Sequence, residues 1–309
     1  MCLYPLLRGA ITLNFMMKKL IFSLFVLISI ALSAKADKYF EYPIVPDSIA
    51  SYQARCDYQA QHFFDFCDLS KAFSNRTRMG EEFNVYLTIT DNATPRVADR
   101  EARAFMKKLE KQPADQLFIA ELAEARLYGD SAQAWLDALY LPYAESVAAN
   151  RRIGKAEKAR FAQQALQLRN STVGQRIFPL PYTRPDGSTG NLAADSAEVT
   201  VIFFNTPGCD DCEMARMRLA FDISTTDLIR EGKMKVVSIS LCEPDSEWHS
   251  FIASMPDEWV KGAAPDADLA LDLRAGTPSF YILGRGSRIK FKHLDIDALL
   301  DVSRQLKKR

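Results

Sequence analysis

The sequence predicts two folded parts behind an N-terminal leader. These are an all-α domain over residues 37–170 and an α/β domain over residues 171–309, whose central mixed sheet is flanked by helices. Two observations predict this division. Apolar residues recur at helical spacing before about residue 170, whereas after Gly174 short apolar strands alternate with helical patterns. The chain of 309 residues is long enough for two modest domains. Its 48% hydrophobic and 25% charged residues are typical of a folded soluble protein.

The N-terminus has the pattern of a secretory signal peptide, predicted over residues 1–36. Met16-Met17-Lys18-Lys19 supplies a positively charged start, and Leu20–Leu32 is an apolar run broken only by serines. Ala34-Lys35-Ala36 then provides small residues for cleavage before Asp37. The residues that precede this pattern are interpreted as an over-long start. We therefore expect export to the periplasm or cell envelope, an oxidising compartment in which cysteine pairs cycle.

The leader also affects which partners we expect, namely a membrane or a nucleic acid. Its apolar run is shorter than the roughly 20 residues of a membrane span, so we expect no stable membrane insertion beyond this segment. Retention of the leader as an uncleaved anchor is the alternative. Removing residues 1–36 leaves 35 Lys and Arg against 39 Asp and Glu, a formal charge of −4. That charge gives no electrostatic reason to bind nucleic acid.

The all-α domain is predicted from apolar spacing between about Ser51 and Asn170. Ala102, Phe105 and Leu109, for example, fall on one helical face. Four helix-breaking residues divide the stretch into about five helices. They are Pro113, Gly129, Pro142 and Gly154.

The α/β domain is predicted to follow the order strand, helix, strand, helix, strand, strand, helix. Its strands are near-continuous apolar runs of the kind that is buried on both faces. The predicted strands are Val199–Phe204, Met234–Leu241, Ser279–Leu283 and Arg288–Lys292, the last two joined by a turn at residues 284–287. The predicted helices follow Cys212, occupy the Trp248–Val260 stretch and span Asp295–Leu306.

Cys209-x-x-Cys212 lies between a predicted buried strand and a predicted helix. This spacing lets both thiols join one disulfide when the second cysteine is in the first helical turn. The unpaired N–H groups and the partial positive charge of a helix N-terminus favour the thiolate at Cys209. The sequence therefore predicts a catalytic pair, in which Cys209 attacks a partner disulfide and Cys212 resolves the mixed disulfide.

Thr277-Pro278 lies about 65 residues after Cys212, at the head of an apolar strand. Proline in a sheet is confined to strand starts, edges and bulges. A cis X–Pro bond is a feature of tight turns. Two interpretations follow: a simple strand start, or a cis-proline loop that takes part in the site.

Further motifs accompany the cysteines: Phe203-Phe204-x-x-Pro207-x-Cys209-x-x-Cys212, the Trp248…Pro256…Trp259 stretch, and Arg274-x-x-Thr277-Pro278. With them, residues 174 to about 305 resemble the TlpA/ResA-like branch of the thioredoxin superfamily. The resemblance implies a thioredoxin fold, protein thiol or disulfide clients, an upstream electron donor, and no cofactor or metal. It also implies that a cis Thr277-Pro278 loop faces the cysteine pair and binds the client backbone.

The N-terminal domain carries a second, shorter set of motifs. It contains Tyr42-Pro43…Pro46-Asp47-Ser48…Arg55 and then His62-Phe63-Phe64-Asp65-Phe66. In this it resembles a helical domain of unknown function that precedes thioredoxin domains in Gram-negative envelope proteins. The resemblance implies nothing about chemistry.

The cysteine motif departs from the family pattern. The frequent Trp-Cys is Gly208-Cys209 here, and Asp210-Asp211 separates the cysteines. Two negative charges oppose the helix-terminus effect, disfavour the thiolate and make the disulfide less oxidising. Pro207, Gly208, Asp210 and Asp211 are therefore expected to tune the redox potential towards a reductase. Alternatively, the two aspartates only favour a helix start.

The remaining cysteines are weaker candidates. Cys56 and Cys67 are 11 residues apart in a predicted helical stretch. That spacing corresponds to roughly 16 Å along a helix, so both are interpreted as packed thiols. Cys242 follows the second predicted strand and is interpreted as a structural cysteine, with a third thiol near Cys209 as the alternative.

Three other functions compete with thiol–disulfide exchange. The histidines His62, His249 and His293 stand in no recognisable nucleophile context, which argues against a hydrolase. A thiolate metal site completed by His249 or Cys242 lacks a second paired ligand motif. A redox-inactive docking module of the cell envelope stays open because of Gly208 and the aspartate pair.

Overall fold

The computed structural model describes residues 40–194 and 197–308. The predicted signal peptide, including Cys2, lies outside the described residues. The chain divides into two compact units, and the boundary lies between Ala98 and Asp99. Within the described ranges, no helix combines the length and the apolar character needed to cross a membrane.

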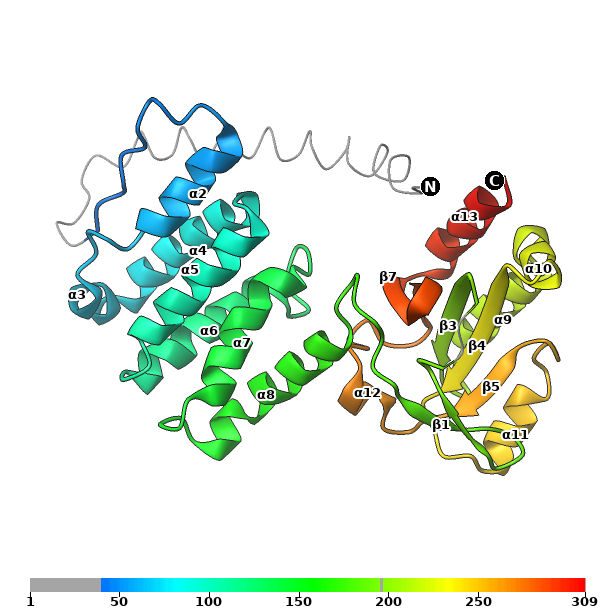
Figure 1. The fold of residues 1–309 in the computed structure, drawn as a ribbon. Helices are drawn as coiled ribbons and strands as arrows, with labels where there is room; N and C mark the ends of the chain where they lie inside the picture. The colour runs from blue at the N-terminus through cyan, green and yellow to red at the C-terminus, as the bar shows by residue number, and fades with distance from the viewer. Residues whose placement is uncertain (1–39, 195–196, 309) are drawn as a thin grey trace. The chain divides into compact units, whose positions relative to one another are not determined.

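Short polar side chains cap the N-termini of three helices in the first unit. Ser51, Asp68 and Asn75 each accept a hydrogen bond from a backbone N–H in the first turn of the helix that they precede. The helices are α2 (Tyr52–His62), α3 (Leu69–Ser74), α4 (Arg76–Asn92) and α5 (Pro95–Lys108), which crosses the unit boundary (Figure 1).

An aromatic cluster forms the core of the first unit. Phe40, in the extended lead-in, packs edge-on against Phe63 with ring centroids 5.3 Å apart. Phe63 and Phe64 in turn contact Tyr86 of α4. These rings are at most 9% exposed, so the lead-in peptide contributes directly to the core.

Three more helices open the second unit: α6 (Pro113–Leu127), α7 (Asp137–Ala149) and α8 (Lys155–Asn170). The described part of the chain thus has seven helices before residue 171, and the predicted number of about five was wrong. The extra boundaries are marked by Asp68 and Asn75, which are side-chain caps rather than glycine or proline breaks. Pro142 was also wrongly predicted to end a helix, because it lies inside α7. It removes only one intrahelical hydrogen bond, and it is buried with Tyr140 and Tyr143 on the packed face.

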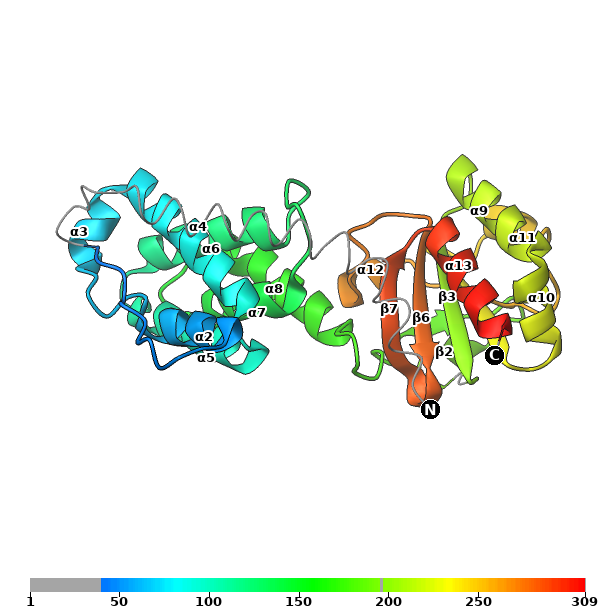
Figure 2. The ribbon, with the colours of Figure 1, turned by 90° about the horizontal axis from the view of Figure 1, so that it is seen from above.

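A seven-stranded mixed sheet organises the rest of the second unit, in the order β2-β1-β5-β4-β3-β6-β7 (Figures 1 and 2). Its strands are β1 (Pro181–Thr183), β2 (Thr189–Asn191), β3 (Val199–Asn205), β4 (Met234–Ser240), β5 (Val260–Ala263), β6 (Ser279–Gly284) and β7 (Arg288–Leu294). The helices are α9 (Asp210–Phe221), α10 (Ile223–Arg230), α11 (Ser246–Ile252), α12 (Ala267–Ala270) and α13 (Ile296–Lys307), with a 3-10 turn η1 (Arg285–Ser287) between β6 and β7. The predicted class, an α/β domain with a mixed central sheet after an all-α part, is confirmed.

The sheet is covered on both faces. Helices α9, α10 and α13 contact one another and cover one face, next to β3 and β6 in Figure 2. On the other face, Ile202 and Phe204 of β3 join a buried cluster with Tyr182, Leu271 and the β6 residue Tyr281. Because successive residues of β3 point to opposite faces, this burial explains the near-continuous apolar run of the strand.

Strand β5 was missed by the sequence analysis, which assigned residues 248–260 to one helical stretch. Helix α11 ends at Ile252, and Val260 begins a strand that pairs parallel with β4. The strand has four residues, too few to show a period-2 pattern of its own. Its position is explained by tertiary packing, because the buried ring of Tyr182 lies over Gly262.

We predict that Gly262→Ala destabilises the second unit by about 1–3 kcal/mol, as overpacking does in other cores. A Cβ at this position would lie 2.3 Å from Cδ2 of Tyr182. Urea unfolding followed by tryptophan fluorescence measures the change. Gly129→Ala is the matched control, since its nearest contact would be at 3.4 Å. Equal unfolding midpoints for Gly262→Ala and the unmodified protein would show that the ring does not hold β5.

Candidate functional site

The carboxyl end of β3 positions the candidate site. β3 pairs parallel with β4 and antiparallel with β6, with Phe204 opposite Ser279. The loop that follows β3 and the loop that precedes β6 therefore meet at one edge of the sheet. The first loop carries the cysteine pair, and the second carries Thr277 and Pro278.

Cys209 and Cys212 form a disulfide with their Cα atoms 5.2 Å apart, within the usual range for such a bond. Cys209 is the N-cap of α9, and its sulfur accepts a hydrogen bond from the backbone N–H of Cys212 at 3.1 Å. Cys212 is fully buried, whereas Cys209 is partly exposed. An external thiol or disulfide therefore reaches the sulfur of Cys209 first.

Gly208 shapes the turn into α9. Its φ of +73° lies in the left-handed region, which a side-chain-bearing residue adopts only with strain. The residue is exposed, and a Cβ there would meet no atom within 4 Å. Glycine at this position is thus required by the backbone, and the sulfur of Cys209 has no aromatic side chain in front of it from residue 208. Pro207, partly buried, precedes this turn.

Acidic residues fill the first turn of α9. Asp210 and Asp211 are exposed, and Glu213 pairs with Arg216 one turn later. The Arg216 guanidinium lowers the pKa of Glu213, and it also donates to the carbonyl of Ser254 at 2.7 Å. Three carboxylates at a helix N-terminus stabilise the helix and place negative charge beside the cysteines. Both interpretations of Asp210 and Asp211 therefore remain compatible with their positions.

The Thr277–Pro278 peptide bond is cis. Thr277 Oγ1 lies 3.2 Å from Oγ1 of Thr206, which belongs to the loop between β3 and α9. Both Thr277 and Pro278 are partly exposed. The two loops are thus joined by a side-chain hydrogen bond three residues before Cys209, a contact that sequence reasoning missed because the two residues are 71 apart.

A neutral polar network lies at the end of β3. Asn205 is fully buried, and its Nδ2 donates to Ser238 Oγ at 2.8 Å. Ser240 Oγ donates to Asn205 Oδ1 at 2.8 Å. The sequence analysis did not single out these residues, although a polar residue after an apolar strand is a usable signal. The network satisfies its buried groups without an ionisable side chain.

Cys242 lies in the segment that follows β4, at the same edge of the sheet, because Leu241 N–H donates to the Asn205 carbonyl at 2.9 Å. Burial, together with the negative charges of Asp245 and Glu247, raises the pKa of the Cys242 thiol to about 11. A thiol with this pKa is a poor nucleophile near neutral pH. The structural interpretation of Cys242 is the one that this environment favours.

The other residues discussed in the sequence analysis lie away from this edge or inside the core. Cys56 is buried in α2, as expected of a packed thiol, whereas Cys67 lies beyond the end of this helix at His62 and is only partly buried. Trp248 and Trp259 are 0% and 4% exposed, and Trp259 packs edge-on against Phe203 of β3. Within residues 40–194 and 197–308, no group of three or more Cys, His, Asp or Glu is arranged to hold a metal ion.

Comparisons with known proteins agree with this architecture. Residues 22–171 match a family described as a domain of unknown function, DUF5106. A thioredoxin-like protein from Bacteroides caccae has a similar solved structure, with a TM-score of 0.67 and 21% identity. The similarity covers 87% of this chain and 99% of that one. The predicted order, a helical domain of unknown function followed by a thioredoxin fold, is confirmed.

Two further solved structures match a smaller share of the chain. The C-terminal domain of an uncharacterized protein from Bacteroides fragilis is 26% identical, with a TM-score of 0.40, and covers 44% of this chain and 99% of its own. A domain of a possible thiol-disulfide isomerase from Cytophaga hutchinsonii is 23% identical, with a TM-score of 0.38 and coverages of 44% and 93%. No curated protein is significantly similar to the chain.

We predict that Cys242 reacts slowly with iodoacetamide at pH 8, because a pKa of about 11 leaves about one thiol in a thousand ionised. Its rate should rise about tenfold per pH unit between pH 8 and pH 10. Peptide mass spectrometry of the oxidised protein follows this residue alone, and Cys242→Ser identifies its peptide. A labelling midpoint near pH 8.5 would show instead an ordinary exposed thiol.

Proposed function

We propose that this protein is an exported thiol–disulfide oxidoreductase that works in the reducing direction. The observation that carries the proposal is the Cys209–Cys212 disulfide at the tip of α9, beside a cis-proline loop that is hydrogen-bonded to the cysteine loop. The thioredoxin-like fold supports the same chemistry as a general class. Its partners are protein disulfide clients and an upstream dithiol donor.

The reaction begins with the reduced pair. The Cys209 thiolate attacks one sulfur of a client disulfide, and the second client sulfur leaves and takes up a proton. Cys212 then loses its proton and attacks the sulfur of Cys209, which releases the first client sulfur as a second thiol. Two electrons pass to the client, Cys209 and Cys212 become the disulfide, and the dithiol donor reduces them again.

The proposal gives the two cysteines separate tasks, and their different exposure supports this division. Cys209 is the partly exposed member, and its sulfur accepts a hydrogen bond from the backbone N–H of Cys212, which stabilises negative charge on that sulfur. Cys212 is buried and is reached only from within the site. Thr277 and Pro278 offer a client a backbone carbonyl and a surface that lacks a competing N–H.

The reducing direction rests on the acidic first turn of α9. Asp210 and Asp211 place two exposed charges next to the sulfur that would carry the thiolate. Destabilising that thiolate destabilises the reduced form relative to the disulfide, and the pair then donates electrons more readily. Gly208 leaves this sulfur open on one side, which suits bulky protein disulfides.

Export to the periplasm or cell envelope is part of the proposal. The support is the Lys18-Lys19 start, the Leu20–Leu32 apolar run and the small residues before Asp37.

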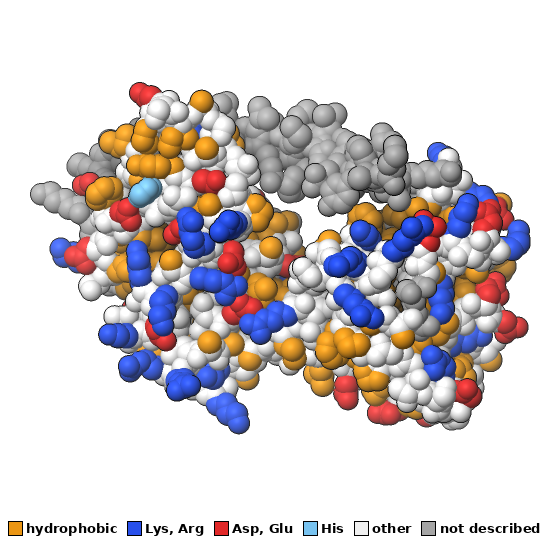
Figure 3. All heavy atoms as spheres, viewed as in Figure 1, with side chains coloured by type: hydrophobic (Ala, Val, Ile, Leu, Met, Phe, Trp, Pro, Cys, Tyr) orange, Lys and Arg blue, Asp and Glu red, His pale blue; other side chains and the backbone are white. Residues whose placement is uncertain are grey.

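Lys and Arg are interspersed with Asp and Glu on the face shown in Figure 3. This mixture fits protein clients better than a polyanion such as nucleic acid.

We predict that Cys212→Ser accumulates a stable mixed disulfide with insulin through Cys209, because no second thiol resolves it. Non-reducing gels and mass spectrometry of the linked peptides measure the adduct. Cys209→Ser is the control and should give none. If neither variant forms an adduct and the unmodified pair does not cycle, the docking module is the better description. Zinc near one equivalent in purified protein would favour the thiolate metal site.

We predict that Asp210→Asn/Asp211→Asn raises the reduction potential by roughly 10–30 mV, since removing both charges stabilises the thiolate. Equilibration with glutathione buffers measures this potential. Asp297→Asn/Asp301→Asn removes two exposed charges from α13 and serves as the control. An unchanged potential would leave the aspartates as helix-starting residues only. A potential of the unmodified protein near roughly −120 mV, that of a strong periplasmic oxidant, would contradict the reducing direction.

A further inference from the structure

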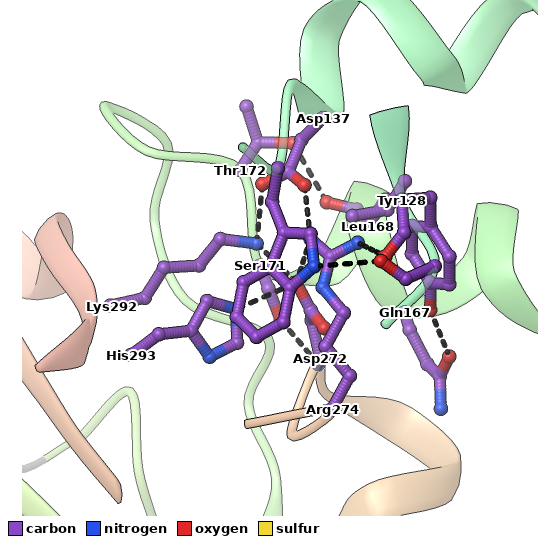
Figure 4. Close-up of polar contacts among 12 residues, drawn as sticks. Tyr128, Asp137, Gln167, Leu168, Ser171, Thr172, Asp272, Arg274, Lys292 and His293 are labelled. Carbon is purple, nitrogen blue, oxygen red and sulfur yellow. Dashed lines mark hydrogen bonds and ion pairs between the residues drawn. The ribbon is translucent and has the colours of Figure 1, made fainter. Parts of the chain in front are cut away.

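Arg274 lies at the centre of a polar cluster in the second unit (Figure 4). Its guanidinium forms ion pairs with Asp137, the first residue of α7, and with Asp272. It also donates to the Tyr128 carbonyl at 3.3 Å. The guanidinium carbon lies 4.0 Å from the ring centre of Tyr128 and 4.6 Å from that of Trp135. The side chain is only 10% exposed, so its planar group is held from several directions.

Asp272 is the buried anion of this cluster, with a side chain that is 0% exposed. Its Oδ2 pairs with Lys292 and lies 3.0 Å from Nε2 of His293. Burial alone would raise the pKa of this carboxyl, but the hydrogen bond from His293 and the charge of Lys292 hold it well below its usual range. Lys292 also pairs with Asp137 at 2.8 Å. Lys292 of β7 thus pairs with both of the carboxylates that Arg274 contacts.

The backbone around Asp272 is held as well. Its N–H donates to Ser171 Oγ, at the end of α8, at 2.9 Å. Its carbonyl accepts a hydrogen bond from the Tyr281 hydroxyl of β6. Side-chain amides of α8 reach the carbonyls of α12: Gln167 donates to Asp268 O at 2.5 Å, and Asn170 donates to Ala270 O at 2.9 Å.

This cluster is next to the cis-proline loop along the chain. Two residues separate Arg274 from Thr277, and one of them, Gly276, has a φ of +76°. Thr277 then contacts Thr206, in the cysteine loop. A continuous path therefore leads from the helices α6–α8, through Arg274, to the loop that is hydrogen-bonded to the cysteine loop.

We infer that Arg274 is a positioning residue, which fixes the Thr277–Pro278 loop against the segment between α6 and α7 and so sets the geometry for client docking. The helices α6–α8 are then a working part of the client site rather than a separate module. This inference rests on the proposed function and assigns a task to helices whose sequence implied none.

The test compares Arg274→Gln and Asp137→Asn with the unmodified protein. The first readout is hydrogen–deuterium exchange of peptides covering residues 271–280, which needs no enzymatic activity. The others are the kcat/KM for insulin reduction, the reduction potential, and the rate of reduction by dithiothreitol. Arg285→Gln is the matched control, because this exposed arginine pairs with Glu198 at the far end of β6.

Both variants should speed exchange in the loop and lower kcat/KM for insulin by about tenfold, with the potential and the dithiothreitol rate unchanged. Arg274→Lys keeps the positive charge but loses the planar guanidinium and its stacking on the aromatic rings. Compared with Arg274→Gln, it should therefore restore part of the protection of the loop amides from exchange. The double variant should be no worse than either single one.

The outcomes separate the two proposals. Unchanged exchange in Arg274→Gln overturns the positioning role, whether or not the protein reduces insulin. Faster exchange with unchanged kcat/KM overturns the link to client docking. An unmodified protein that reduces no insulin overturns the proposed function, while the exchange data still decide whether Arg274 holds the loop. If Arg274→Gln fails to fold, Asp137→Asn and Arg274→Lys provide the same comparison.

Discussion

The pairing of β3 with β4 and β6 is the constraint on which the candidate site depends. Because β4 runs parallel to β3, the segment that carries Cys242 leaves the sheet beside the cysteine loop. Because β6 runs antiparallel, the residues before its first strand position arrive at the same edge. Cys209 and Thr277 are distant in sequence, and strand register brings their loops together. The hydrogen bond between Thr206 and Thr277 then fixes the approach.

Opposing electrostatic effects act on the cysteine pair at this edge. The helix end and the N–H of Cys212 favour negative charge on the sulfur of Cys209. In the proposed function Asp210 and Asp211 oppose this effect, from exposed positions where solvent screens their charge. At the end of β3, Asn205, Ser238 and Ser240 satisfy one another without adding charge. This buried network therefore contributes no ionisable group, and the proposed tuning rests on the exposed residues of the helix tip.

The sequence was sufficient wherever the determinants are local. An apolar run followed by Cys209-x-x-Cys212 and a helical pattern predicted β3, the disulfide region and α9, and the apolar runs at β4 and β6 were equally clear. The strand β5 escaped because its four residues are placed by the ring of Tyr182 from another strand. Pro142 was predicted to end a helix but lies inside α7, because its tertiary packing on the buried face outweighs one lost hydrogen bond. The sequence analysis did not predict the ion pair of Arg274 with Asp137, because the two residues are 137 positions apart.

The energetics of the Arg274 cluster favour a positioning role over a stabilising one. Taking two carboxylates and two cations out of water costs free energy that their attraction only partly returns. The cluster is also incompletely satisfied, because Arg274 Nε, Asp272 Oδ1 and His293 Nδ1 are buried without a hydrogen-bond partner in the described structure. An apolar contact of similar size would hold α7 against β7 as well or better. An apolar contact is not directional. The guanidinium of Arg274, held between two carboxylates and two aromatic rings, forms directional contacts that fix the orientation of the backbone around Arg274. Because Thr277 lies only three residues after Arg274, the fixed orientation of Arg274 also fixes the position of the cis-proline loop.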